Sequence, residues 1–203
     1  AAFVLQYRLA PRYHHPAPLD DAQRALRFVR ANAEKYGVRP DRVGIMGFSA
    51  GGHLASTAAT RFDQGKAGGD AGDRASSRPD FAVPAYAVIT FTAEPFVHQG
   101  SRRNLLGENP GPALTESLST ELQVTNRTPP VFLFHTTADT TVPSENSVLF
   151  YLAARKAGVP AELHIYAGSG HGFGLRANDT KPAGKWIERF EEWLADDGLL
   201  KKS

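Results

Sequence analysis

The sequence predicts an α/β fold in which a mainly parallel sheet carries helices on both faces. Short runs rich in β-branched and aromatic residues alternate along the whole chain with segments that have helical periodicity. The chain has 203 residues, 41% of them hydrophobic, which is enough for one sizeable core. We therefore expect a single domain covering residues 1–203.

The strands and helices follow one another in alternation. Strands are expected at residues 1–11, 41–48, 81–91, 129–136 and 161–168; Pro11 closes the first, and Pro129 and Pro130 bound the fourth. Helices are expected at residues 19–36, 49–62, 144–158 and 183–198, where apolar side chains recur every three or four positions. Residues 63–80, rich in Gly, Ser and charge, predict an exposed loop, and residues 93–128 predict short helices and turns.

Composition excludes several classes of function. Lys and Arg number 23 against 21 for Asp and Glu, and this near balance argues against a nucleic-acid or membrane-surface binder. The absence of cysteine excludes disulfides, thiolate metal sites and a cysteine nucleophile, and it fits either a reducing or an oxidising compartment. The longest apolar stretch, residues 81–92, is too short to span a bilayer. These observations favour a small substrate and leave the cellular location open.

The segment GIMGFSAGGHLAS places Ser49 in the turn between a predicted strand and a predicted helix. In a parallel sheet such turns lie at the carboxyl ends of the strands, where active sites form. Gly47 and Gly51 flank the serine two residues away on each side, and they would let strand and helix approach closely. The N–H of Ala50 would then face an oxyanion formed beside Ser49. The alternative is a glycine-rich helix start with a capping serine.

A nucleophilic serine needs a base, and the base needs a carboxylate to orient it. Asp139 follows the predicted strand 129–136, and His171 follows the predicted strand 161–168. The chain order Ser, Asp, His is that of the α/β-hydrolase triad. Glu145 is the alternative acid, but it falls in the next predicted helix.

Other residues are candidates for the substrate pocket. Phe91 and Phe96 could wall a small apolar acyl pocket, His98 could contact substrate, and Phe173 could border the same pocket. No metal site is expected, because the adjacent pair His14 and His15 has no third ligand at suitable spacing.

Several segments together carry a family resemblance. They include YRLAPRYHHPAPLDDAQRALRFVRANAEKYGVRPDRVGIMGFSAGGHLAS and HTTADTTVPSENSVLFYLAARKAGVPAELHIYAGSGHGFGL. In these segments the chain resembles bacterial α/β-hydrolase esterases of the acetyl esterase, acetyl-xylan esterase or feruloyl-esterase-like type. The resemblance implies hydrolysis of short-acyl carboxylic esters, such as those of acetylated carbohydrate, without cofactor or metal. It also implies that Ser49 attacks the ester, that His171 is the general base, and that Asp139 holds His171.

The chain also departs from this family. Such enzymes carry an HGGG-like loop that completes the oxyanion hole, and a strand that lies between those resembling AFVLQYRLA and DRVGIMGF; neither is found in the sequence. We therefore expect an amino-terminally incomplete α/β-hydrolase domain, the carboxyl-terminal portion of a longer one. A separate amino-terminal fragment or a homodimer would complete the sheet.

Two other functions remain open at this point. A serine peptidase of the prolyl-oligopeptidase type shares the turn and the triad order. A non-catalytic hydrolase-like binding module would keep the fold without the reaction.

Overall fold

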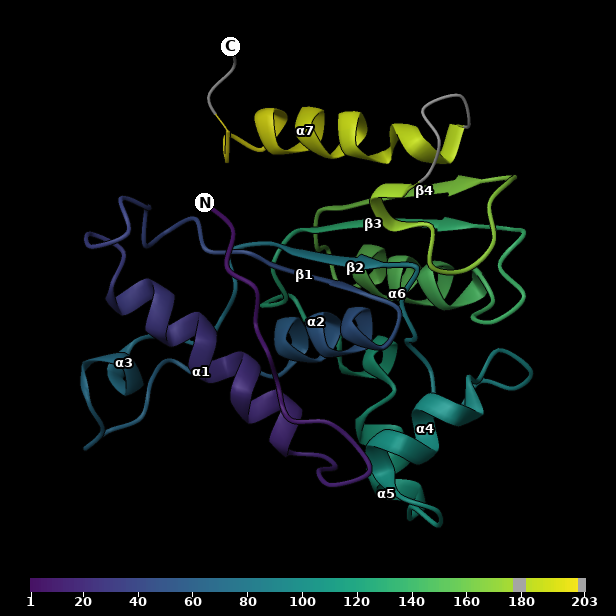
Figure 1. Ribbon diagram of the computed structural model, residues 1–203, viewed down its shortest axis with the longest axis horizontal. Coiled ribbons are helices and arrows are strands. Elements are labelled where there is room, and N and C mark those ends of the chain that lie inside the picture. The colour runs from purple at the N-terminus through teal and green to yellow at the C-terminus, as the bar shows by residue number, and fades with distance from the viewer. Residues whose placement is uncertain (177–181, 201–203) are drawn as a thin grey trace.

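The computed structural model describes residues 1–176 and 182–200, and its centre is a four-stranded parallel sheet (Figure 1). The strands are β1 (Ile45–Phe48), β2 (Ala82–Ala85), β3 (Val131–Thr136) and β4 (Ala161–Tyr166), in the spatial order β1-β2-β3-β4. All three neighbouring pairs are parallel, so the four carboxyl ends lie at one edge of the sheet. The predicted parallel sheet is confirmed.

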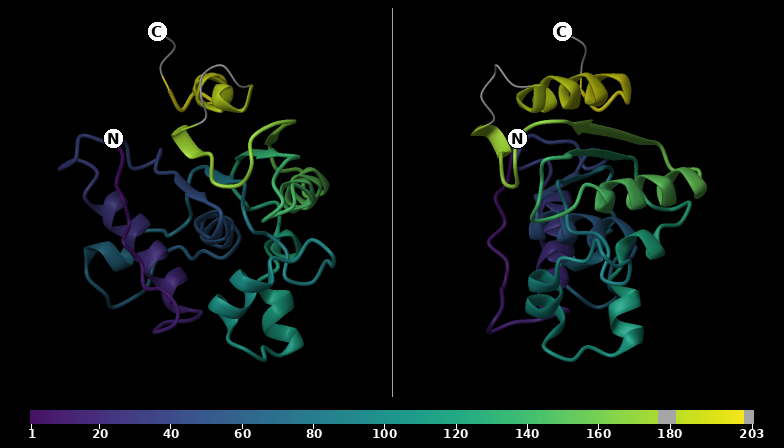
Figure 2. Two further views of the ribbon diagram at one scale, coloured as in Figure 1. Left: turned by 45° about the vertical axis from the view of Figure 1, so that its right-hand side comes forward. Right: turned by 90° about the vertical axis from the view of Figure 1, so that its right-hand side faces the viewer.

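Helices cover both faces of this sheet, as expected. They are α1 (Ala17–Ala31), α2 (Ala50–Thr60), α3 (Ala71–Arg74), α4 (Gln99–Leu106), α5 (Pro112–Ser117), α6 (Glu145–Lys156) and α7 (Trp186–Asp196). Short 3₁₀ turns lie at Thr120–Gln123, Gly174–Arg176 and Pro182–Lys185. Helix α7 lies on one side of the sheet, and α2 and α6 lie on the other (Figures 1 and 2). None of the helices in the described ranges is both long and apolar enough to span a membrane.

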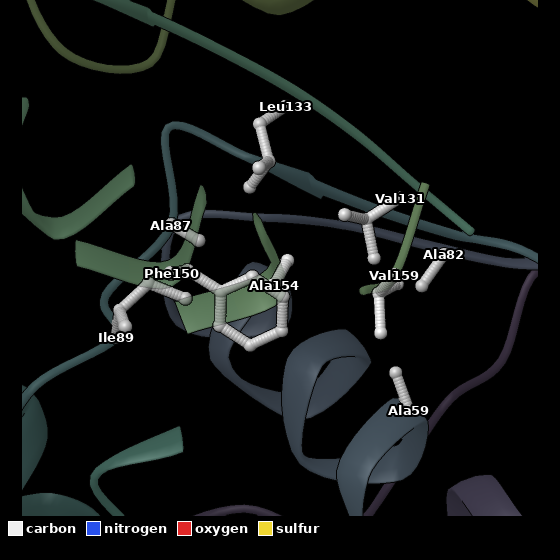
Figure 3. Close-up of a cluster of buried hydrophobic side chains, with 9 residues drawn as sticks. All are labelled: Ala59, Ala82, Ala87, Ile89, Val131, Leu133, Phe150, Ala154 and Val159. Atoms are coloured by element: carbon white, nitrogen blue, oxygen red, sulfur yellow. The ribbon is translucent and has the colours of Figure 1, made fainter. Parts of the chain in front are cut away.

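Alternation along β3 divides the core into two layers. Val131 and Leu133 point toward α2 and α6, where they join a fully buried cluster that includes Phe150 (Figure 3). Phe132 and Phe134 point the other way, toward α7, and the Phe134 ring stacks on Trp186 with centroids 4.2 Å apart. Burying a side chain of this size stabilises the fold by about 1.5–3 kcal/mol. The core therefore packs against β3 from both sides and holds the carboxyl end of this strand, where the next residues begin, in a fixed position.

The prediction of a strand at residues 1–11 is wrong. Residues 1–9 form no strand in the structure, and Val4 is 99% exposed. Side chains hold this segment: Arg8 pairs with Asp21 on α1 at 2.7 Å, and the Phe3 ring packs edge-on against Tyr36. High β propensity is not enough without a neighbouring strand to accept the backbone hydrogen bonds.

Several other segments differ from the sequence prediction in extent, among them the helix expected at residues 19–36, which ends at Ala31. The strand expected at residues 81–91 ends at Ala85, because Tyr86 adopts a positive φ of 31° and turns the chain away from the sheet. The loop at residues 63–80 contains the short helix α3, and Asp63 within it pairs with the buried Arg27 of α1. That loop is therefore tied to the body of the domain.

Candidate active site

Three side chains from separate strand ends meet at the carboxyl edge of the sheet. Ser49 follows β1 directly, Asp139 follows β3, and His171 follows β4. Ser49 Oγ lies 2.7 Å from His171 Nε2, and His171 Nδ1 lies 2.6 Å from Asp139 Oδ2. The structure thus brings together the three residues singled out from the sequence.

Ser49 sits in a strained turn. Its φ of 56° and ψ of −119° place a non-glycine residue in a sparsely populated region of backbone space. The conformation turns β1 sharply into α2, so that the hydroxyl projects toward His171. Strain of this kind persists only where the surrounding structure enforces it.

The glycines around the turn differ in how much room each has for a side chain. A Cβ on Gly47 would overlap the backbone carbonyl of Gly51, so this position requires glycine. At Gly51 itself a Cβ would have only the Tyr7 hydroxyl nearby, at 3.8 Å, whereas at Gly52 it would lie 2.5 Å from the Ala87 Cβ. The expectation that both flanking glycines allow the close approach therefore holds for Gly47, and the second tight position is Gly52 rather than Gly51.

The start of α2 supplies backbone donors beside Ser49. Ala50 is the first residue of the helix, and the first four N–H groups of a helix have no acceptor within it. The Ser49 carbonyl is engaged in the helix, accepting from the His53 N–H at 3.1 Å. An anion formed next to Ser49 would therefore meet the Ala50 N–H and the positive end of the helix dipole.

Asp139 is held from several directions. Its carboxyl is fully buried, and its Oδ1 accepts the backbone N–H groups of Thr141 at 3.0 Å and Val142 at 2.9 Å. Its Oδ2 accepts the hydrogen on His171 Nδ1, since a carboxylate can only accept. With that hydrogen on Nδ1, the Nε2 of neutral His171 is left to accept the proton of Ser49.

The loop that carries His171 is anchored to β3 and covered by Tyr86. Thr136 Oγ1 donates to the Ser169 carbonyl at 2.5 Å, two residues before the histidine. The Tyr86 ring packs edge-on against the His171 ring, with centroids 5.3 Å apart. Sequence reasoning missed Tyr86, because the predicted strand ran past it to residue 91, whereas β2 ends at Ala85.

A cavity of about 270 Å³ lies beside the start of α2. Its wall is mainly apolar and comes from residues 7–19, α2, α4 and two further residues, Phe91 and Leu118. Ala50 lines this cavity, whereas Ser49 and His171 do not. Phe91 is almost fully buried and stacks on His53, with ring centroids 4.7 Å apart. The cavity thus borders the start of α2 at Ala50, next to Ser49.

The other three pocket candidates lie outside this cavity. The His98 side chain caps α4, where its Nδ1 accepts from the Ser101 N–H at 3.1 Å. Phe96 is half-buried in the connection before α4, and Phe173 packs between Tyr86 and Phe134 on the α7 side. Of the four pocket candidates, Phe91 alone lines this cavity.

No group of three or more potential metal ligands is found within residues 1–176 and 182–200. His14, one of the adjacent pair in the sequence, has its Nδ1 2.8 Å from the Asn104 carbonyl and so helps to anchor the loop before α1.

Comparison with known proteins gives two family matches. Residues 1–153 match the BD-FAE family, and residues 111–196 match the dienelactone hydrolase family. Among curated relatives, the chain is 39% identical over 181 residues to the endo-1,4-beta-xylanase B of Butyrivibrio fibrisolvens, covering 88% of this chain and 28% of that protein. It is 34% identical over 207 residues to the acetylxylan esterase of Xylanibacter ruminicola, covering 100% of this chain and 39% of that protein.

Among solved structures, the acetyl ester-xyloside bifunctional hydrolase of Caldicellulosiruptor lactoaceticus is 48% identical, with a TM-score of 0.93. The superposition covers 98% of this chain and 72% of that one. The chain thus spans well under half the length of these two curated relatives and nearly three quarters of the solved one. By the family match over residues 1–153 and by this structural similarity, the chain belongs to the BD-FAE family and has an α/β-hydrolase fold.

Proposed function

We propose that the chain carries the catalytic machinery of a serine carboxylic-ester hydrolase that acts on short-acyl esters, acetylated carbohydrate among them. The observation that carries the proposal is the hydrogen-bonded series from Ser49 through His171 to Asp139, with distances of 2.7 and 2.6 Å. The names of the acetylxylan esterase and of the acetyl ester-xyloside hydrolase support the choice of acetyl esters.

The first half of the reaction forms an acyl-enzyme. His171 Nε2 takes the hydroxyl proton of Ser49 as the oxygen attacks the ester carbonyl, and Asp139 stabilises the resulting imidazolium. The carbonyl oxygen becomes an oxyanion, which accepts a hydrogen bond from the Ala50 N–H. When this intermediate collapses, His171 gives the proton to the departing alcohol, and the acyl group remains on Ser49.

The second half releases the acid. A water molecule gives a proton to His171 while its oxygen attacks the acyl carbonyl, and a second oxyanion forms at the same donors. Collapse of that intermediate breaks the bond to Ser49, which regains its proton from His171. Ser49, His171 and Asp139 thus return to their starting state, and no cofactor takes part.

The cavity next to Ala50 is suited to the acyl group. A carbonyl oxygen bound by the Ala50 N–H would bring the acyl chain toward the apolar wall that includes Phe91 and Leu54. The volume of about 270 Å³ admits a short acyl chain.

The outer edge of β1 offers a place for a further strand that could complete the site. Among the described strands only β2 pairs with β1, and Met46 and Phe48 on it are 38% and 37% exposed. We propose that a further strand, from a separate amino-terminal fragment or a second copy of the chain, pairs with this edge and adds a second oxyanion donor. Light scattering of the chain, alone and with such a fragment, distinguishes the two sources.

The function is tested by hydrolysis of p-nitrophenyl acetate and by acetate release from acetylated xylan, each with wild-type chain and Ser49→Ala. Activity on both substrates that disappears in the variant is the expected result. A peptide p-nitroanilide cleaved faster than either ester would replace the proposal with a peptidase. No activity in wild type, with a completing fragment present, would leave a binding module.

A further inference from the structure

A second histidine lies against the acid of the triad. His135 is on β3, four residues before Asp139, and its side chain is completely buried. Its Nε2 lies 3.3 Å from Asp139 Oδ2, the same oxygen that accepts from His171. The mechanism described above does not use this residue.

The hydrogen bonds around His135 determine which nitrogen carries the hydrogen. Nε2 lies 3.0 Å from the Val142 carbonyl and 3.3 Å from the Asp139 carboxylate, and both of these groups can only accept. Nδ1 lies 2.8 Å from the hydroxyl of Ser147 on α6, and that hydroxyl can donate. The ring therefore carries its hydrogen on Nε2 and accepts at Nδ1.

We propose that His135 is a positioning residue, whose Nε2 donates to the Val142 carbonyl and lies 3.3 Å from Asp139 Oδ2, and which so holds that carboxylate in place for His171. The proposal rests on the proposed function, because it assigns His135 a part in the same reaction. Burial lowers the pKa of His135, so the ring stays neutral. A neutral donor orients the carboxylate without adding a second positive charge that would compete with the imidazolium of His171.

The surroundings contain few other titratable groups that could produce the same effect. Asp139 faces His135 from the loop after β3, and His171 faces it from the loop after β4. His98, at the start of α4, interacts electrostatically with Asp139 and His171, and Tyr86, from the end of β2, contacts the His171 ring. Of these groups, Asp139 is the one that His135 approaches within 3.3 Å.

The first test reads the tautomer directly and needs no activity. Long-range ¹H–¹⁵N correlation spectra of the chain with labelled histidine, assigned with His135→Gln, report which ring nitrogen carries hydrogen. The expected result is a neutral His135 protonated on Nε2 at neutral pH. A ring protonated on Nδ1, or on both nitrogens, would overturn the proposal.

The second test compares three variants by the pH profile of kcat/KM for p-nitrophenyl acetate. His135→Leu removes the donor, and we expect a loss of about 10-fold to 100-fold, the range for a hydrogen bond to a charged group. The acidic limb should move to higher pH, because an unshared carboxylate attracts the proton on His171 more strongly. His135→Gln retains an N–H donor and should recover most of the loss. His164→Gln, the same change at a histidine on β4 away from the site, should match wild type.

Two results would overturn the proposal. One is a Leu variant whose kcat/KM and acidic limb of the pH profile match wild type, and the other is a Gln variant whose kcat/KM is no higher than that of the Leu variant. If His135→Leu does not fold, Ser147→Ala removes only the partner of Nδ1 and should move the limb in the same direction by less. An unmoved limb in Ser147→Ala would then count against the proposal. Wild-type chain without Ser49-dependent hydrolysis, even with a completing fragment present, would refute the proposed function, whereas the tautomer spectrum would still report on His135.

Discussion

The side of the site built by β3 and β4 differs from the side built by β1. Around Asp139, two backbone N–H groups and the His171 ring donate within 3.0 Å, and a buried His135 lies beside the same carboxyl. Around Ala50, the neighbours are a cavity and a strand whose outer edge pairs with no other described strand. Asp139 and His171 are therefore held by hydrogen bonds within the described chain, whereas the start of α2 borders a cavity and an unpaired strand edge.

The largest expected effect is at Ser49, the proposed nucleophile, which the two sides share. Ser49→Ala should reduce hydrolysis of p-nitrophenyl acetate by a factor on the order of a thousand or more, because no other group can form the acyl-enzyme. Circular dichroism should be unchanged, since the substitution removes a single hydroxyl. Ser76→Ala is the matched control, because that hydroxyl bonds only within the loop at residues 63–80. Equal activity in the two variants would contradict the assignment of Ser49.

The next effect tests the tightly held side. Asp139→Asn should lower kcat by about a thousandfold or more at neutral pH, because an amide in place of Oδ2 can present N–H to His171 and reverse its tautomer. Glu145→Gln changes the alternative acid, at the start of α6, and should leave kcat within about twofold of wild type. If the losses were reversed, Glu145 would be the acid of the triad.

The same comparison explains which parts of the site could be predicted from the sequence. Ser49, Asp139 and His171 each follow a strand directly or in the next short loop, so periodicity and spacing were enough to place them together. Tyr86 and His135 were missed as parts of the site because their roles depend on neighbours from other strands, which a linear pattern does not contain. Residues 1–11 were wrongly assigned to a strand for a related reason: propensity describes a side chain, whereas a strand exists only through its partner.

A smaller effect concerns the stability of the turn into α2. Gly47→Ala should lower the free energy of unfolding by about 2–4 kcal/mol, because its Cβ would collide with backbone that cannot move aside. Gly51→Ala is the control, and it should change stability by about 1 kcal/mol or less, since the position has room and alanine favours helix. Urea denaturation of both variants measures the difference. Equal losses would mean that the turn tolerates no side chain at either position.

The smallest effect is expected at the loosely held amino-terminal segment. Arg8→Ala removes the pair with Asp21 and should leave global stability nearly unchanged, since the pair is solvent-exposed. Limited proteolysis should nevertheless cut residues 1–15 faster in this variant. Arg39→Ala, which removes an exposed pair with Asp41, should leave that rate unchanged, and acceleration in both variants would contradict the anchoring role of Arg8.

The stabilisation of the fold by the Arg8–Asp21 pair also depends on pH. The hydrogen bond from Arg8 lowers the pKa of Asp21 below its ordinary value of 3.8. The pair therefore stabilises the fold fully above about pH 4, and the stabilisation is lost as the pH falls through the lowered pKa. Proteolysis of wild-type chain should consequently be constant from about pH 5 to 8.

The most direct test of the whole account is mass spectrometry of the chain quenched soon after mixing with p-nitrophenyl acetate. The account predicts one acetyl group, mapped by peptide sequencing to Ser49 and absent from Ser49→Ala. An acetyl group on any other residue, or turnover without a covalent adduct on Ser49, would contradict it.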